Sequence, residues 1–132
     1  MSRENVELVR LALEAVAHED WSGLTAFLSP KFELHDFDVP DGEVYYGPDG
    51  LLDWAANWGT AWESWSVDDL DFRPVGDDRV LVLFRFAAKG KGSGIELNRA
   101  DATVCTLREG KISRVEYYND QQQALEAVGL SE

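Results

Sequence analysis

Asp36 is the residue of this sequence best suited to acid–base chemistry. It lies in the segment from Phe32 to Phe37, whose alternation predicts a short strand with Phe32, Leu34 and Asp36 on one face. A carboxylate among apolar side chains has its ionised form disfavoured, so its pKa rises towards that of a useful general base. We therefore predict that Asp36 is catalytic. The alternative is an Asp that caps a turn or pairs with Arg99.

Polar side chains on two later strands share the predicted face with Asp36. Arg99 and Asp101 lie two residues apart, and they either bind an anionic or carbonyl group or pair with each other. Tyr117 and Asn119 are further hydrogen-bond candidates. The predicted lining of a pocket on this face is Leu34, Trp54, Trp58, Trp62, Phe84, Phe86, Arg99, Asp101, Thr103, Tyr117 and Asn119. This assignment depends on strand register, because a slip of one residue exchanges each set for its neighbours.

The aromatic members of that set include a stripe of tryptophans. Trp54, Trp58 and Trp62 recur every four residues after Gly47-Pro48, and a proline in the first turn favours the start of a helix. Such a stripe can stack on a flat ligand, although aromatic residues at helical spacing usually belong to a core.

Motifs for metals, phosphates and cofactors are missing from the sequence. The glycine-rich run Lys89–Gly94 joins two predicted strands instead of opening a helix, so we expect a hairpin there. His18, His35 and Cys105 share no metal-ligand spacing, and His35 alternates away from Asp36. We therefore expect neither a metal nor a cofactor.

Composition is typical of a single globular domain. The 132 residues are 45% hydrophobic, and we expect one domain over residues 1–132. A formal charge of −13, from 25 acidic and 12 basic residues, repels phosphate backbones and anionic lipid, so nucleic acid and membranes are not expected partners. The chain has no apolar run of about 18 residues, no signal pattern and a single cysteine, Cys105, which together favour a cytoplasmic protein.

Apolar periodicity, caps and prolines predict four helices. They are Arg3 to about Ala17; a short helix capped by Asp20, carrying Leu24, Phe27 and Leu28 and ended by Pro30; a helix from Gly47-Pro48 carrying Leu51, Trp54, Trp58, Trp62 and Trp65; and Asp120 to about Val128.

The predicted strands are Phe32 to Phe37, an edge strand from Val67 to Val75, and an antiparallel meander from Arg79 to Asn119. The first strand of the meander is apolar on both faces, with Val82 and Phe84 on one and Leu81 and Leu83 on the other. Helices of the chain can cover one face. For the other we expect a partner subunit, and therefore a homodimer.

This order of helices and strands predicts the α+β class. We expect a cone-shaped, curved antiparallel sheet wrapped around the N-terminal helices, an arrangement described as an α+β barrel.

Five short motifs span nearly the whole chain. They are Asn5–Arg10, His35-Asp36, Tyr46–Gly50, Gly110–Ile112 and Tyr117–Leu125. With the order of elements, they resemble the nuclear transport factor 2-like superfamily, within it the polyketide-cyclase-like and ketosteroid-isomerase-like branch. The resemblance implies a cone-shaped barrel, a deep apolar pocket and dimers formed through the outer sheet face.

The resemblance carries over only part of the functional residues. Asp36 matches the proton-shuttling carboxylate of ketosteroid isomerases. Their oxyanion-hole tyrosine matches a position near Ala12, and their second acid matches Ala102 or Thr103. The Asp-Arg-Asp group of the epoxide-hydrolysing members falls near Phe84, Phe86 and Tyr117.

Two classes of function follow from these observations. The first is a cofactor-free isomerase, cyclase or dehydratase that acts on an apolar carbonyl compound with Asp36 as base. The second is a non-catalytic module that binds a hydrophobic small molecule or serves a larger assembly as a dimer.

Overall fold

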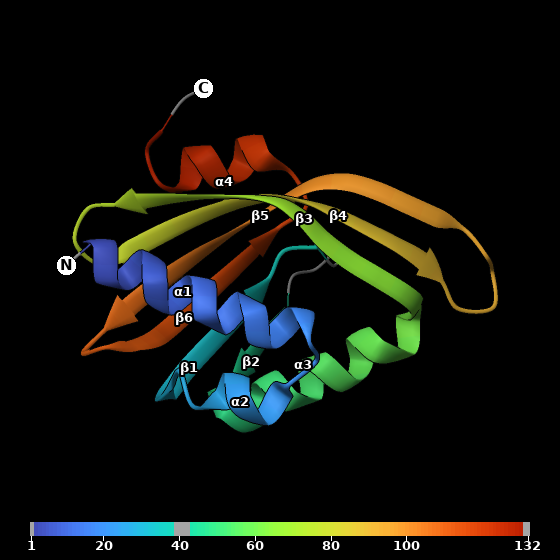
Figure 1. The fold of residues 1–132 in the computed structure, drawn as a ribbon, viewed down its shortest axis with the longest axis horizontal. Coiled ribbons are helices and arrows are strands. Elements are labelled where there is room, and N and C mark those ends of the chain that lie inside the picture. The colour runs from blue at the N-terminus through green and yellow to red at the C-terminus, as the bar shows by residue number, and fades with distance from the viewer. Residues whose placement is uncertain (1, 39–42, 131–132) are drawn as a thin grey trace.

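The computed structural model describes residues 2–38 and 43–130 of the chain. Its elements are α1 (Ser2–Ala17), α2 (Trp21–Thr25), β1 (Leu28–Asp36), β2 (Glu43–Tyr46), α3 (Gly47–Ala61), β3 (Trp62–Val75), β4 (Arg79–Gly90), β5 (Glu96–Arg108), β6 (Lys111–Tyr118) and α4 (Gln121–Ala127). A curved sheet separates α1, α2 and α3 on one side from α4 on the other (Figure 1). The predicted α+β class is confirmed.

One six-stranded sheet, in the order β2-β1-β6-β5-β4-β3, forms the frame of the molecule. The meander of β4, β5 and β6 is antiparallel as predicted, and β3 lies at the edge. The sheet is mixed, because β1 pairs with β6 in parallel. This pairing places Asp36 opposite Tyr117, which in turn lies opposite Thr103. Three candidate residues therefore form a row across three neighbouring strands.

The second helix is shorter than predicted. Asp20 caps it as expected, since its Oδ1 accepts a hydrogen bond of 3.0 Å from the backbone N–H of Gly23. The helix ends at Thr25, however, and Leu28 and Pro30 belong to β1. Proline is tolerated there because the β1–β6 register shifts between Leu28 and Glu33, where no regular ladder requires its missing N–H.

The tryptophan stripe is divided between two elements. The sequence placed Trp62 and Trp65 on the third helix, but α3 ends at Ala61 and both residues lie in β3. Trp62 has an extended backbone, with φ −119° and ψ 133°. The spacing was misleading because both residues still face Trp58, with ring centroids 5.9 and 6.1 Å from it.

The inner face of the sheet carries the main core. Val82, Phe84 and Phe86 of β4 are at most 4% exposed and pack with Val9 of α1 and Leu24 of α2. The predicted register of β4 is therefore correct, and its alternate residues point to the other side.

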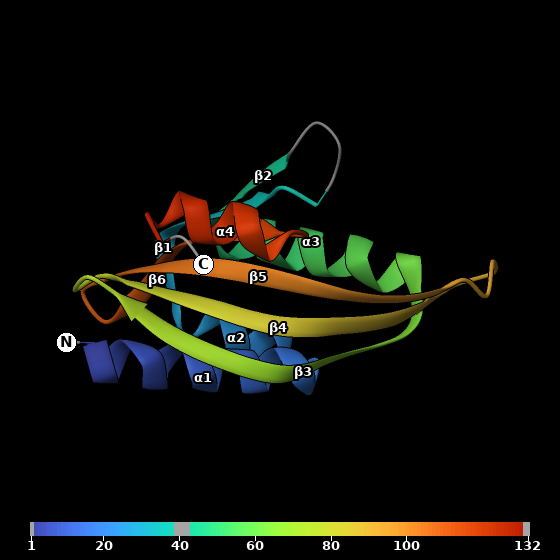
Figure 2. The same cartoon turned by 90° about the horizontal axis from the view of Figure 1, so that it is seen from above.

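Part of the outer face of the sheet is covered by the chain itself. Leu81 and Val104 are fully buried and pack with Leu125 of α4 and with Val128, which follows this helix. The helix lies over the outer face of the sheet (Figures 1 and 2). Our expectation that this part of β4 needs a partner subunit was wrong, because the C-terminal helix supplies the missing layer. The homodimer itself stays a prediction.

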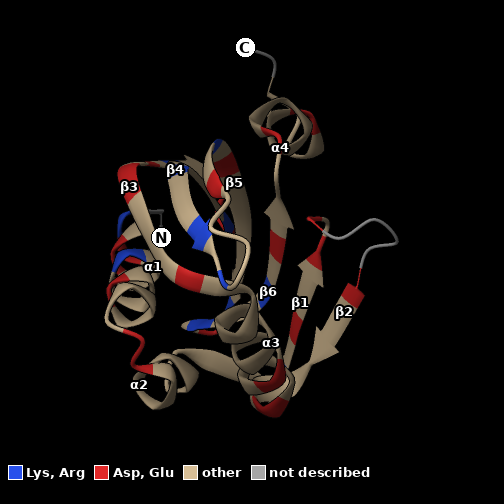
Figure 3. Cartoon of the chain, turned by 90° about the vertical axis from the view of Figure 1, so that its right-hand side faces the viewer, with Lys and Arg blue, Asp and Glu red and all other residues tan. Residues whose placement is uncertain are grey.

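Acidic residues occur on several helices and strands of the molecule. Acidic segments occur on α1, on α4 and on the strands between them (Figure 3). Among the described helices, none has the length and apolar character of a membrane span.

Candidate functional site

A cavity of about 110 Å³ lies between the inner face of the sheet and the three helices that cover it. Its wall combines residues from α1, α2, α3 and all strands except β2. Seven of the eleven residues predicted to line a pocket do so: Leu34, Trp54, Trp58, Phe84, Phe86, Thr103 and Tyr117. The other four, Trp62, Arg99, Asp101 and Asn119, lie outside this wall.

Asp36 is buried beside the cavity, with 6% of its surface exposed. Its Oδ2 accepts a hydrogen bond of 2.9 Å from Trp54 Nε1, and its Oδ1 accepts one of 2.9 Å from the backbone N–H of Asp38. Asp36 does not itself line the cavity, whereas Trp54 does. The indole of Trp54 therefore connects the carboxylate to the cavity wall.

Burial raises the pKa of Asp36, because the ionised form loses solvation. The hydrogen bonds from Trp54 and Asp38 act in the opposite direction, but they do not outweigh burial. Arg99 makes no ion pair with Asp36; it pairs with Asp38 and Asp101 instead. The alternative in which Arg99 neutralises Asp36 is therefore wrong.

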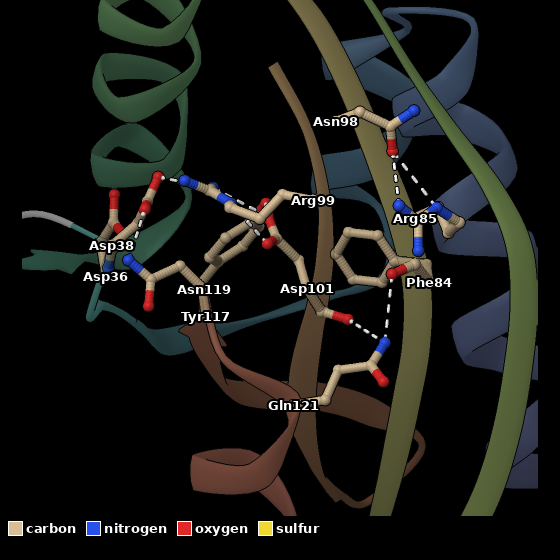
Figure 4. Close-up of polar contacts among 10 residues, drawn as sticks. All are labelled: Asp36, Asp38, Phe84, Arg85, Asn98, Arg99, Asp101, Tyr117, Asn119 and Gln121. Carbon is tan, nitrogen blue, oxygen red and sulfur yellow. Dashed lines mark hydrogen bonds and ion pairs between the residues drawn. The ribbon is translucent and has the colours of Figure 1, made fainter.

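A chain of polar contacts extends from Asp38 to Tyr117 (Figure 4). Arg99 donates to Asp101 through Nε (2.6 Å) and Nη2 (2.9 Å), and its Nη2 lies 3.2 Å from Asp38. The hydroxyl of Tyr117 donates to Asp101, and Asn119 donates to Asp38 at 3.1 Å. Arg99 is thus held by two carboxylates, so of the two predicted roles the ion pair is the one that forms.

The ionisation of these groups follows from their partners. Burial by itself would lower the pKa of Arg99, but the hydrogen bond and charge of Asp101 dominate and raise it. Burial and the Asp101 carboxylate both raise the pKa of Tyr117 far above its ordinary value. Arg99 is therefore a charged guanidinium and Tyr117 a neutral phenol, and neither side chain acts as a base near neutral pH.

Two further polar side chains lie on the cavity wall in β5. Burial raises the pKa of Cys105 to about 12, which keeps it a neutral thiol and removes it as a nucleophile. Thr103 is 7% exposed, and its hydroxyl interacts with the Cys105 thiol, which opposes the effect of burial on the pKa of Cys105.

Sequence reasoning missed the part that Asp38 plays. Asp38 follows Asp36 by two residues and lies in the turn after β1, so the available signal was a second acid this close to Asp36. Gln121 was also missed; its Nε2 donates to the backbone oxygens of Phe84 and Asp101 and joins α4 to β4 and β5 (Figure 4).

The histidine next to Asp36 in the sequence faces away from it. His35 contacts Glu33, with its Nε2 2.8 Å from Glu33 Oε1, on the side of β1 opposite to Asp36. In the part of the chain that the structure describes, no three His, Cys, Asp or Glu residues form a group that could hold a metal ion.

Comparison with known families and structures gives one consistent result. The SnoaL-like domain family matches residues 9–115. No curated protein matches the sequence.

Solved structures match over nearly the full length of the chain. A putative polyketide cyclase from Xanthomonas campestris pv. campestris has a TM-score of 0.80 and 18% identity, covering 97% of this chain and 98% of that one. TerC, co-crystallised with polyporic acid, has a TM-score of 0.77 and 20% identity, covering 95% and 98%.

A third similar structure is a hypothetical protein with a ketosteroid isomerase-like fold from Catenulispora acidiphila DSM 44928, in complex with trimethylamine. Its TM-score is 0.75 and its identity 19%, covering 94% of this chain and 93% of that one. At such identities these structures establish the fold. The resemblance inferred from the sequence motifs is thereby confirmed.

Proposed function

The chain belongs to the SnoaL-like domain family, and from that premise we propose that it binds a small apolar carbonyl compound and that Asp36 is the general base of a cofactor-free reaction. The reaction class is isomerisation, cyclisation or dehydration. In each case the first step is removal of a proton from a carbon next to the carbonyl group.

The observation that supports this proposal is the environment of Asp36. It is a buried carboxyl whose pKa burial raises, and it is joined through Trp54 to an apolar cavity. Each of its oxygens accepts one hydrogen bond, so each keeps a further acceptor position. In the proposed step the C–H bond breaks, the proton passes to Asp36 and the electron pair moves to the carbonyl oxygen as an enolate. The protonated Asp36 then returns the proton to another atom.

The cavity limits the size of the compound. Its 110 Å³ lies below the roughly 300–1,000 Å³ of drug-sized sites, and is close to the roughly 150 Å³ of an apolar cavity that accepts benzene. We therefore propose a compound of about one ring. Larger ligands would require Trp54, Trp58 or their neighbours to move.

Small-molecule binding is in keeping with similar proteins. TerC was co-crystallised with polyporic acid, and the Catenulispora protein forms a complex with trimethylamine. Different small molecules thus associate with proteins of this fold, and the proposal extends that property to this chain.

The second candidate is a non-catalytic ligand-binding or dimeric accessory module. It is favoured by the fact that Asp36 stands outside the cavity wall and by the engagement of Arg99 and Tyr117 with Asp101. These contacts leave few groups free to polarise a carbonyl oxygen.

Hydrogen–deuterium exchange at carbon separates the two candidates. Small ketones, such as cyclohexanone, are incubated with the protein in deuterated buffer, and deuterium at the α-carbon is followed by NMR. A general base contributes about 10²–10⁴-fold, so wild type should accelerate exchange and Asp36→Asn should lose that acceleration. Asp53→Asn, an exposed acid on α3 next to Trp54, is the matched control.

Two outcomes of this experiment would contradict the proposed role of Asp36. Binding of ketones with no exchange above the buffer rate would favour the non-catalytic module. Exchange that Asp36→Asn leaves intact would remove Asp36 from the mechanism.

A further inference from the structure

A second hollow, of about 850 Å³, shares no lining residue with the cavity described above. Its wall comes from β1, β4, β5, β6 and the turn between β5 and β6, with Ala127 at the end of α4. Four of the twelve basic residues of the chain gather here: Lys31, Arg79, Arg108 and Arg114. In a chain of formal charge −13, such a group of cations sets this hollow apart from the rest of the molecule.

Thr106 lies between two arginines of the hollow wall. It pairs with Arg79 of β4 on one side and with Arg114 of β6 on the other. All three side chains point to the outer face of the sheet, since their neighbours Val80 and Cys105 belong to the inner core. Adjacent strands lie about 4.8 Å apart, so the two arginines start about 10 Å from each other, and both guanidinium groups can reach a point above the Thr106 hydroxyl.

The chain itself neutralises these arginines only in part. Arg108 lies two residues beyond Thr106 on the same face, and neither it nor Arg79 has an ion pair or side-chain hydrogen bond among the described residues. Arg114 Nη2 lies 3.4 Å from Glu116 Oε2, but its Nε is buried without a partner among the described residues. Like charges held close together repel, and a buried donor without an acceptor is costly. A bound anion would remove both costs.

The carboxylates on the same wall do not supply that anion. Glu116 contacts Arg114 through Nη2, which leaves Nε unpaired. Glu33 is engaged elsewhere, with its Oε1 2.8 Å from His35 Nε2. Glu109 lies in the exposed turn after β5 and has no ion pair among the described residues. The arginine donors of the hollow therefore stay available to a ligand.

A β-bulge shapes the strand beneath these arginines. In the β5–β6 ladder, Thr106 pairs with Arg114 and Leu107 with Ile112, so Ser113 is an extra residue in β6. A bulge bends its strand and re-aims a side chain, and bulges are frequent beside functional sites. The Ser113 hydroxyl donates to the backbone oxygen of Thr106 at 3.2 Å, and both residues line the hollow. The bulge thus holds two polar residues next to the arginines.

We propose that this hollow is a binding site for a phosphate group, either free or carried by a small molecule. Guanidinium groups bind phosphate through charge-assisted, often bidentate hydrogen bonds. Donors from Arg79, Arg108 and Arg114 approach from different sides, which suits a tetrahedral phosphate better than a flat carboxylate. The hollow is much larger than one phosphate group, so the rest of a phosphate ester has room beside it. The net charge of the chain still disfavours polyanions such as nucleic acid.

Titration of ¹⁵N-labelled protein with inorganic phosphate, phenyl phosphate and acetate tests the proposal. At constant pH and ionic strength, the amide signals of Thr106, Ser113 and Arg114 should shift most with both phosphate compounds. Acetate should bind at least about tenfold more weakly, because it offers fewer oxygens and less charge to the arginines. Tighter binding of phenyl phosphate would identify an ester as the ligand, and equal or weaker binding would identify inorganic phosphate.

Two arginine variants and a matched control locate the site. Arg79→Met and Arg114→Met should each weaken phosphate about tenfold, since a charge-assisted hydrogen bond contributes on that scale. Arg85→Met is the control, because Arg85 lies on β4 and on the same outer face but bonds to Asn98. It lies about 20 Å along the strand from Arg79, beyond the range of an unscreened charge. Its loss should change the affinity by less than about twofold.

Three results would overturn the proposal. If neither phosphate compound shifts these amides at millimolar concentration, the hollow is not a phosphate site. If acetate binds as tightly as phosphate, the hollow recognises negative charge and not the phosphate group. If Arg85→Met weakens phosphate as much as Arg79→Met does, only the net charge of the chain matters. None of these results bears on the cavity or on Asp36, which ketone exchange tests separately.

Discussion

Trp54 Nε1 donates a hydrogen bond to Asp36 Oδ2 across 2.9 Å, and this contact joins α3 to the end of β1. It links the proposed base of the protein to the cavity, because the same indole forms part of the cavity wall. The hydrogen bond stabilises the ionised carboxylate, and so it opposes the effect of burial on the pKa of Asp36.

Removing that donor should raise the pKa of Asp36. Trp54→Phe keeps an aromatic ring and deletes Nε1, so burial is less opposed. The pKa can be followed by NMR of a carboxyl-labelled sample, with Trp58→Phe as control because Trp58 makes no hydrogen bond to Asp36 among those of the described residues. A lower pKa in Trp54→Phe would show that the indole does not stabilise the carboxylate.

The stability of the protein should depend on pH through Asp36. Burial raises its folded pKa above the unfolded value of about 3.9, so the folded state binds this proton more tightly. The resulting stabilisation is complete below the unfolded pKa and is lost as pH rises through the folded pKa. The Tm of wild type minus that of Asp36→Asn should therefore fall as pH rises through this window.

Thermal unfolding at closely spaced pH values provides this measurement. Asp53→Asn, which changes an exposed carboxyl, is measured over the same range as the control. A difference for Asp36→Asn that rises with pH would mean that its hydrogen bonds, and not burial, dominate.

The Arg99–Asp101 ion pair should be important for stability. Asp101 is fully buried, so Arg99→Met leaves its charge, among the described residues, with the Tyr117 hydroxyl alone and should cost about 3 kcal/mol. Arg73→Met breaks an exposed pair with Asp71 and should cost at most about 1 kcal/mol. Urea unfolding gives both values. Equal losses of unfolding free energy in the two variants would mean that the buried ion pair contributes no more to stability than the exposed one.

The C-terminal helix should be essential to the outer face. Leu125 is 6% exposed and packs on the face that contains Leu81 and Val104. Leu125→Ala should cost about 2–5 kcal/mol of unfolding free energy. Leu52→Ala, on the exposed side of α3, should cost less than about 1 kcal/mol. A loss below that of Leu52→Ala would mean that α4 does not hold the outer face.

A homodimer through the rest of the outer face can be tested separately. Ala87 lies on this face of β4, outside the cluster that α4 covers. Wild type is expected to sediment as a dimer at micromolar concentration, and Ala87→Lys should shift it towards monomer. A wild-type monomer at that concentration would contradict the prediction.

Local patterns in the sequence determined the strands of the meander and their two faces. Residues of β4 and β5 alternate with a period of two, so the side to which Phe84, Asp101 and Thr103 point follows once the strands are identified. The helix cap at Asp20 was equally local, because an N-cap contacts only the next turn. These features depend on neighbours a few residues away, and sequence order supplies those neighbours directly.

Only the tertiary structure decided which groups Asp36 and Arg99 would meet. From the sequence, Arg99 could pair with either Asp36 or Asp101. In the structure, Arg99 pairs with Asp101. The parallel pairing of β1 with β6 and the packing of α3 place Asp36 next to Trp54. The cover of the outer face by α4 was decided in the same way. Hydrogen bonds and packing require atoms to meet within a few ångströms, and such distances between remote segments are set by how all layers pack at once.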